Sequence, residues 1–148
     1  MDGLTIAILG LALCVILCGV GSAFGLFFTG RAAAAVLAEK PKAFGGVLTL
    51  SVLPATQGIY GFVLGIMGLG YLSAGMSVEM GWGIFFAALP LAICGLVTGM
   101  LQGLTSVAGL NAIAKKEVSF GRLILFPAMV ETYAILALVI SIMLLGAI

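Results

Sequence analysis

Hydrophobic residues fill the chain in four long runs, and most charged residues lie in the short segments between these runs. Three of the runs, residues 4–30, 43–78 and 80–114, contain no charged residue, and the fourth, residues 123–148, contains a single acid. Each run exceeds the ~20 residues with which an α-helix crosses a ~30 Å hydrocarbon layer. The pattern therefore predicts four transmembrane helices, near residues 4–37, 44–72, 80–113 and 119–148.

The composition agrees with this pattern. The chain has 148 residues, of which 64% are hydrophobic and 7% charged, and its mean hydropathy is +1.38. These values lie far outside the range of soluble domains, so the predicted class is an all-α membrane protein without a water-soluble enzyme domain. The amino terminus lacks the basic segment of a secretory signal, so we expect the first helix to stay in the mature protein. No Gly-x-x-x-x-Gly-Lys-Ser/Thr motif occurs, and no nucleotide-binding loop is expected.

Charge placement predicts the orientation of the helices. The six basic residues all lie on one side of the predicted membrane helices. On the other side the charged residues are only Asp2 and Glu79. Because short loops rich in Lys and Arg stay in the cytoplasm, we expect a multi-pass protein of the cell membrane with cytoplasmic hairpin loops and both termini outside. The six basic residues flank the connection between the first and second helices or that between the third and fourth: Arg31, Lys40, Lys42, Lys115, Lys116 and Arg122.

The two halves of the chain resemble each other. Residues 54–60, PATQGIY, correspond to residues 127–133, PAMVETY, at a constant offset of 73, and the Gly-x-x-x-Gly spacing of residues 21–25 recurs at residues 99–103. Each basic loop follows its glycine-rich helix, so the two hairpins have the same orientation, which excludes an inverted-repeat carrier. We expect a first hairpin at residues 1–72, an external linker at 73–79 and a second hairpin at 80–148. The glycines of each hairpin predict close helix packing.

Glu131 is the single acid of the fourth run, and its counterpart in the first hairpin is Gly58. A carboxylate at the centre of a membrane helix costs at least ~2.5 kcal/mol on insertion scales, so its default interpretation is a working site for a cation or a proton. The alternative is a protonated, hydrogen-bonded acid without such a role.

Two glutamines lie at a similar depth to this acid. At ~1.5 Å per residue, Glu131 lies ~14 Å past Arg122, Gln102 lies ~20 Å before Lys115, and Gln57 lies ~22 Å after Lys42. The three side chains could therefore meet near the middle of the membrane.

Neutral oxygens beside one carboxylate suit a hard monovalent cation stripped of its water. Thr56 and Gln57 follow Pro54, which has no N–H and leaves the carbonyl of Leu50 without its helical partner. Unwound carbonyls beside a cavity are a recurrent cation ligand in membranes. The sequence alone does not say which carbonyl turns inward.

Three long motifs carry a resemblance to a known family: GSAFGLFFTGRAAAA from residue 21, LPATQGIYGF from residue 53 and AMVETYAIL from residue 128. The chain resembles the duplicated proteolipid, known as the K or c subunit, of V-type and A-type rotary ATPases. The resemblance implies a homo-oligomeric ring in membrane lipid, with the glycine-rich helices inside and one ion carried by each copy at the glutamate of the fourth helix. It also implies a stator membrane subunit with an arginine and a central-stalk subunit, no nucleic-acid partner, and no enzymatic activity of the chain on its own.

Sodium-binding members of this family resemble the chain at every ligand position. The resemblance implies side-chain oxygen ligands from Thr56, Gln57, Gln102 and Glu131, a main-chain ligand from the carbonyl of Leu53, and a hydrogen bond from Tyr60 that latches the carboxylate. Proton-binding relatives commonly keep the glutamate without the full oxygen set. The resemblance therefore favours Na+, with H+ as the alternative.

Two other classes stay open at this point. A small secondary transporter could exchange protons for cationic substrates at Glu131, but it needs a substrate cavity, and Trp82 is better placed as an anchor at the membrane surface. A purely structural scaffold or pore could use the glycines for assembly, but it leaves the acid unexplained.

Overall fold

The computed structural model describes residues 1–116 and 119–148. The described helices are α1 (Gly3–Glu39), α2 (Phe44–Val52), α3 (Thr56–Leu69), α4 (Val78–Lys115), α5 (Phe120–Leu123) and α6 (Leu125–Gly146), with 3-10 turns at Pro41–Ala43 and Leu53–Ala55. Together they form four spans long and apolar enough to cross a membrane: Gly3–Glu39, Pro41–Leu69, Val78–Lys115 and Phe120–Gly146. The prediction of four transmembrane helices is confirmed.

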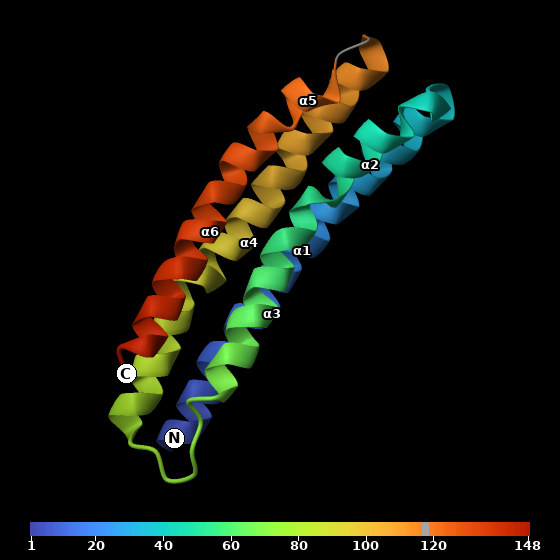
Figure 1. Cartoon of the computed structure of the whole chain (residues 1–148). Coiled ribbons are helices and arrows are strands. Elements are labelled where there is room, and N and C mark those ends of the chain that lie inside the picture. The colour runs from blue at the N-terminus through green and yellow to red at the C-terminus, as the bar shows by residue number, and fades with distance from the viewer. Residues whose placement is uncertain (117–118) are drawn as a thin grey trace.

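The spans form two hairpins that lie side by side with the same orientation (Figure 1). The first pairs α1 with α2 and α3, and the second pairs α4 with α5 and α6. Residues 70–77 connect α3 to α4 at the end of the molecule where both termini lie. The main contact between the hairpins is that of α1 with α4, while α3 packs on α1 and α6 packs on α4. The predicted boundaries of the two hairpins stay a prediction.

Glycines let the backbones of α1 and α4 touch. A Cβ atom added to Gly99 would lie 2.7 Å from the backbone carbon of Gly21, and one added to Gly21 would lie 2.6 Å from the carbonyl oxygen of Gly95. One turn further along, a Cβ on Gly103 would lie 2.5 Å from the Cα of Gly25. No side chain fits in this space, so the predicted close packing of the two glycine-rich helices is confirmed.

Prolines interrupt the second and fourth spans. In the second span the backbone changes to a 3-10 turn at Leu53–Ala55 around Pro54, and α3 ends at Leu69 rather than near residue 72. The fourth span is one helix from Phe120 to Gly146, as predicted, in which the single turn residue Ile124 divides α5 from α6 and Pro127 lies in the first turn of α6. Pro127 has no N–H for the carbonyl four residues earlier, as at Pro54.

A third proline, Pro90, lies inside α4 without breaking it. The backbone N–H of Leu91 donates to the hydroxyl of Ser141 on α6 at 3.3 Å, and the thiol of Cys18 on α1 donates to the carbonyl of Leu91 at 3.4 Å. Side chains of neighbouring helices thus bond to backbone groups next to Pro90, where polar groups in lipid need partners.

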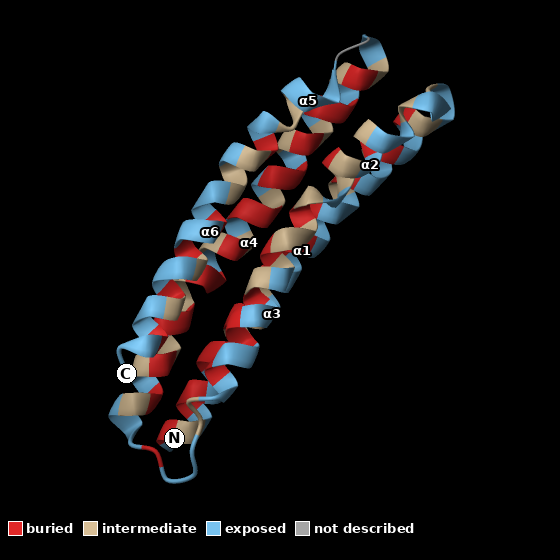
Figure 2. Cartoon of the chain, viewed as in Figure 1, coloured by how far each residue is buried: buried red, intermediate tan, exposed pale blue. Residues whose placement is uncertain are grey.

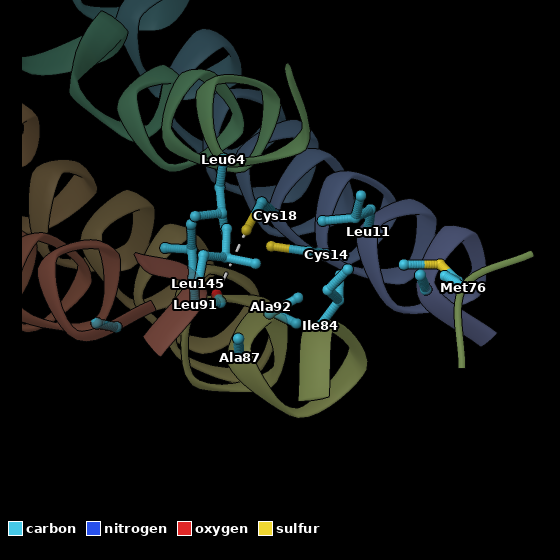
Figure 3. Packing of buried hydrophobic residues seen from close by; sticks show 13 residues of the cluster. Leu11, Cys14, Cys18, Leu64, Met76, Ile84, Ala87, Leu91, Ala92 and Leu145 are labelled. Carbon is cyan, nitrogen blue, oxygen red and sulfur yellow. Dashed lines mark hydrogen bonds between the residues drawn. The ribbon is translucent and has the colours of Figure 1, made fainter. Parts of the chain in front are cut away.

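Buried residues line the surfaces where the helices face one another (Figure 2). Among them are two apolar clusters and a set of buried polar side chains. The larger cluster, near the connection of the hairpins, includes Leu11, Cys18, Leu64, Ile84 and Leu91 (Figure 3). The smaller one lies toward the opposite end and consists of Ala33, Val36, Val47, Leu50, Leu110 and Ile113. All three cysteines are free. The buried polar side chains include residues of the candidate site.

Candidate functional site

Glu131 lies two turns into α6, where that helix meets α3 and α4, and it is half-buried. Its Oε1 atom accepts a hydrogen bond of 2.7 Å from the hydroxyl of Tyr60 on α3. Its Oε2 atom accepts one of 3.2 Å from the Nε2 of Gln102 on α4. The carboxylate is therefore held by one donor from each hairpin, and both donors are neutral.

The two glutamines meet as the count of depth predicts. Both side chains are fully buried, and the Nε2 of Gln57 donates to the Oε1 of Gln102 at 2.7 Å. The Nε2 of Gln102 also donates to the backbone carbonyl of Pro127 at 3.1 Å. A carbonyl can only accept, so this contact fixes the nitrogen of Gln102 toward α6 and its oxygen toward Gln57.

In this orientation the amide oxygen of Gln57 has no hydrogen-bond donor among the described residues. Because the nitrogen of Gln57 faces Gln102, its Oε1 atom points elsewhere, and it has no hydrogen-bond partner among the described residues. A fully buried amide oxygen without a partner is costly, by about 1–3 kcal/mol. Such an atom fits a ligand that supplies positive charge.

Thr56 lies one turn before Tyr60, next to Gln57, and Leu53 lies three residues before Thr56. The hydroxyl of Thr56 donates to the carbonyl of Leu53 at 3.0 Å, and the backbone N–H of Thr56 points to the same carbonyl. Four of the predicted site residues are thus joined in one hydrogen-bond network: Gln57, Tyr60, Gln102 and Glu131. The other two, Thr56 and Leu53, are bonded to each other at the adjacent turn.

Sequence reasoning missed three groups at this site. The Pro127 carbonyl orients Gln102, and the hydroxyls of Ser22 and Thr29 on α1 hold the broken stretch that carries Thr56 and Gln57. The match of Pro127 to Pro54 predicted a disturbed backbone near residue 127, but the missing N–H frees the carbonyl of Leu123 and does not single out that of Pro127. The two hydroxyls gave no signal, since any serine or threonine in a membrane helix can bond to its own backbone.

The two hairpins differ where their sequences correspond. Gly58 stands at the position of Glu131, and its backbone N–H donates to the hydroxyl of Ser22 at 2.7 Å. Tyr60 lies in the site, whereas its counterpart Tyr133 is 66% exposed on α6. The candidate site therefore holds the single carboxylate of Glu131 and is built from side chains of both hairpins.

The chemistry of the site excludes some ligands. No group of three or more His, Cys, Asp or Glu side chains that could hold a metal ion lies in residues 1–116 and 119–148. A transition metal that prefers nitrogen or sulfur has no matching site there. One carboxylate with neutral amide, hydroxyl and carbonyl oxygens suits a hard cation of single charge or a proton.

Comparison with known proteins agrees with this arrangement. The ATP synthase C subunit family matches the chain twice, at residues 9–68 and 85–144. The chain is 45% identical to the V-type sodium ATPase subunit K of Enterococcus hirae over 142 residues, which cover 96% of this chain and 91% of that one. It is 37% identical to the A-type ATP synthase subunit K of Methanocaldococcus jannaschii, over 98% of this chain and 64% of that one. It is 23% identical to the V-type proton ATPase 16 kDa proteolipid of Bos taurus, over 93% of this chain and 89% of that one.

The two family matches coincide with the two hairpins of the fold, and together they span most of the chain. The identities to the two K subunits extend over nearly the whole chain as well. The protein therefore belongs to the ATP synthase C subunit family, as a tandem duplicate similar to the K subunits of V-type and A-type rotary ATPases.

Proposed function

We propose that this protein is the rotor-ring proteolipid of a V-type or A-type ATPase and that each copy carries one Na+ at Glu131. The observation that supports Na+ is the pairing of a single carboxylate with the unpartnered, fully buried Oε1 of Gln57. The similarity to a protein named for a sodium ATPase supports the same ion.

The role of the ion follows from electrostatics. A bare carboxylate facing lipid carries a large desolvation penalty, and a bound cation removes it by cancelling the charge. The loaded site can then cross the lipid as the ring turns, and it releases the ion where a stator subunit offers water. The stator arginine, the central-stalk subunit and the cytoplasmic position of the hairpin loops belong to this proposal.

The ring itself requires two complementary faces on each copy. One apolar groove lies between α1 and α3 and includes Ile8, Val15 and Phe62. Another lies between α4 and α6 and includes Val97 and Met129. Head-to-tail contact between unlike faces of identical chains generates a ring when the rotation closes. In this arrangement the hairpins at residues 1–72 and 80–148, joined by the external linker at 73–79, act as one unit.

Thr56 and Leu53 complete the proposed ligand set. The hydroxyl oxygen of Thr56 keeps lone pairs for a cation while its hydrogen bonds the Leu53 carbonyl. Ligands for Na+ are then the side chains of Thr56, Gln57, Gln102 and Glu131 and the Leu53 carbonyl, with Tyr60 orienting the carboxylate.

Coupling to H+ is the second candidate. The similarity to a proteolipid named for a proton ATPase supports it, although at lower identity. A proton needs only the carboxylate, so this candidate gives the unpartnered Oε1 of Gln57 no ligand. Both candidates leave ATP hydrolysis to other subunits, and this chain acts mechanically.

Carboxyl labelling tests the choice of ion. Dicyclohexylcarbodiimide should modify Glu131 in the purified ring, and Na+ at constant pH should slow the modification because the cation occupies the reactive oxygens. The rate is followed by mass spectrometry at increasing NaCl, with choline chloride at equal ionic strength as the control. Equal rates in both salts would contradict Na+ binding and favour H+.

The variant Gln102→Ala should raise the Na+ concentration for half-maximal protection by about ten- to hundredfold, because it removes a donor to the carboxylate and an amide that orders Gln57. Asn111→Ala is the matched control, since Asn111 is an exposed amide on the same helix. Protection equal to that of the unmodified ring would remove Gln102 from the site.

A further inference from the structure

Two hydroxyls from α1 hold the broken stretch of the second span. The Oγ1 of Thr29 donates to the carbonyl of Ser51 at 2.8 Å, on the α2 side of the break. The Oγ of Ser22 accepts from the N–H of Gly58 at 2.7 Å, on the α3 side. Thr29 is fully buried and Ser22 is 6% exposed, so water does not compete for these bonds.

The break creates the need for both bonds. The first N–H groups of a helix have no acceptor within that helix, and Gly58 is the third residue of α3. The last carbonyls of α2 lack donors for the same reason, and Ser51 is among them. In lipid each unsatisfied group is costly, so the two hydroxyls fix the broken stretch relative to α1.

Gly58 allows the contact on the α3 side. A Cβ atom at this position would lie 3.1 Å from the Oγ of Ser22 and 3.3 Å from its Cβ. These distances are below ordinary van der Waals contact, so a side chain here would push α3 away from α1. The glycine at the position matching Glu131 therefore brings the two helices close enough for the hydrogen bond.

The stretch between the two bonds carries the proposed ligands. Residues 51–58 include the Leu53 carbonyl, the Thr56 hydroxyl and the Gln57 amide. We propose that Ser22 and Thr29 are positioning residues for the cation site, which fix these oxygens without touching the ion. This proposal rests on the proposed function, and it assigns to α1 a part in ion affinity beyond helix packing.

The variant Ser22→Ala tests it in the assembled ATPase. The Na+ concentration for half-maximal ATPase activity should rise about five- to tenfold, as expected for one lost buried hydrogen bond. The maximal rate at saturating Na+ and the amount of assembled ring should stay near those of the unmodified enzyme. A merely structural role would lower the amount of ring without changing that concentration.

Ser106→Ala is the matched control. Ser106 is a fully buried serine on α4, and its hydroxyl has no hydrogen-bond partner among the described residues. Removing this hydroxyl should leave the Na+ dependence unchanged. If Ser22→Ala also leaves the half-maximal Na+ concentration unchanged, and the unmodified enzyme responds to Na+, the positioning role is wrong and the proposed function stands. If the unmodified enzyme ignores Na+, the proposed sodium function is wrong.

Thr29 supplies a second, independent pair of variants. Thr29→Val has nearly the same shape without the hydroxyl, and Thr29→Ser keeps the hydroxyl without the methyl group. Valine should raise the half-maximal Na+ concentration about five- to tenfold, and serine should restore it. Equal Na+ dependence of the two variants would overturn the proposal, also in the event that Ser22→Ala does not assemble.

Discussion

Replacement of Glu131 by Gln should abolish Na+ transport while leaving the protein folded. The introduced amide has no charge to bind a cation or proton, so the site loses its cargo. Its geometry can persist, because the amide oxygen can accept from Gln102 and the amide nitrogen can donate to the Tyr60 hydroxyl. Transport is measured as 22Na+ uptake into vesicles that contain the assembled ATPase, with ring assembly followed by electron microscopy.

Glu79→Gln is the control for this experiment. Glu79 is an exposed carboxylate in the first turn of α4, far from the candidate site. Its removal changes the net charge by the same amount and should leave uptake intact. If the Glu131→Gln enzyme still transported Na+, the carboxylate would not carry the ion, and the interpretation of the whole candidate site would be wrong.

The position of the site could be predicted because it depends on distance along helices. A fixed rise per residue places Gln57, Gln102 and Glu131 at similar depth, and the hydrogen bonds that join them agree with that count. The match between the two halves of the sequence predicted that the first span pairs with the second and the third with the fourth. These inferences need no knowledge of how one helix is rotated against the next.

The details around the prolines could not be predicted in the same way. Pro127 suits the first turn of a helix as well as a break, so the predicted helix from residue 119 onward did not show that a turn at Ile124 would divide α5 from α6. The partners of Ser22 and Thr29 depend on the rotation of α1 against α2 and α3. Rotation follows from packing of the whole bundle, which no single stretch of sequence contains.

The choice between carbonyls shows the same limit. The missing N–H of Pro54 points to the Leu50 carbonyl, while the family resemblance points to Leu53. In the structure the backbone changes to a 3-10 turn at Leu53–Ala55, and Thr29 satisfies the carbonyl of Ser51 instead. A proline therefore predicts that a helix is disturbed, but the carbonyl to which Thr29 donates is one that neither argument named.

The second large effect concerns the contact of α1 with α4. Gly99→Ala should destabilise the protein by about 3 kcal/mol, the upper end of the usual range for overpacking. The new Cβ would lie 2.7 Å from the carbon and 2.9 Å from the oxygen of Gly21. Both atoms belong to backbone, which cannot rotate away as a side chain does, so the two hairpins must separate. Separation would also move Gln102, three residues further along α4, from the site.

Thermal unfolding of the detergent-solubilised ring measures this effect, with Gly30→Ala as the control. A Cβ at Gly30 meets nothing within 4 Å, and alanine in a helix interior is more stable than glycine by about 0.5–1 kcal/mol. The two substitutions are chemically identical, so their opposite signs would isolate the close contact from helix propensity. A Gly99→Ala ring as stable as the unmodified one would show that α1 and α4 do not pack backbone to backbone.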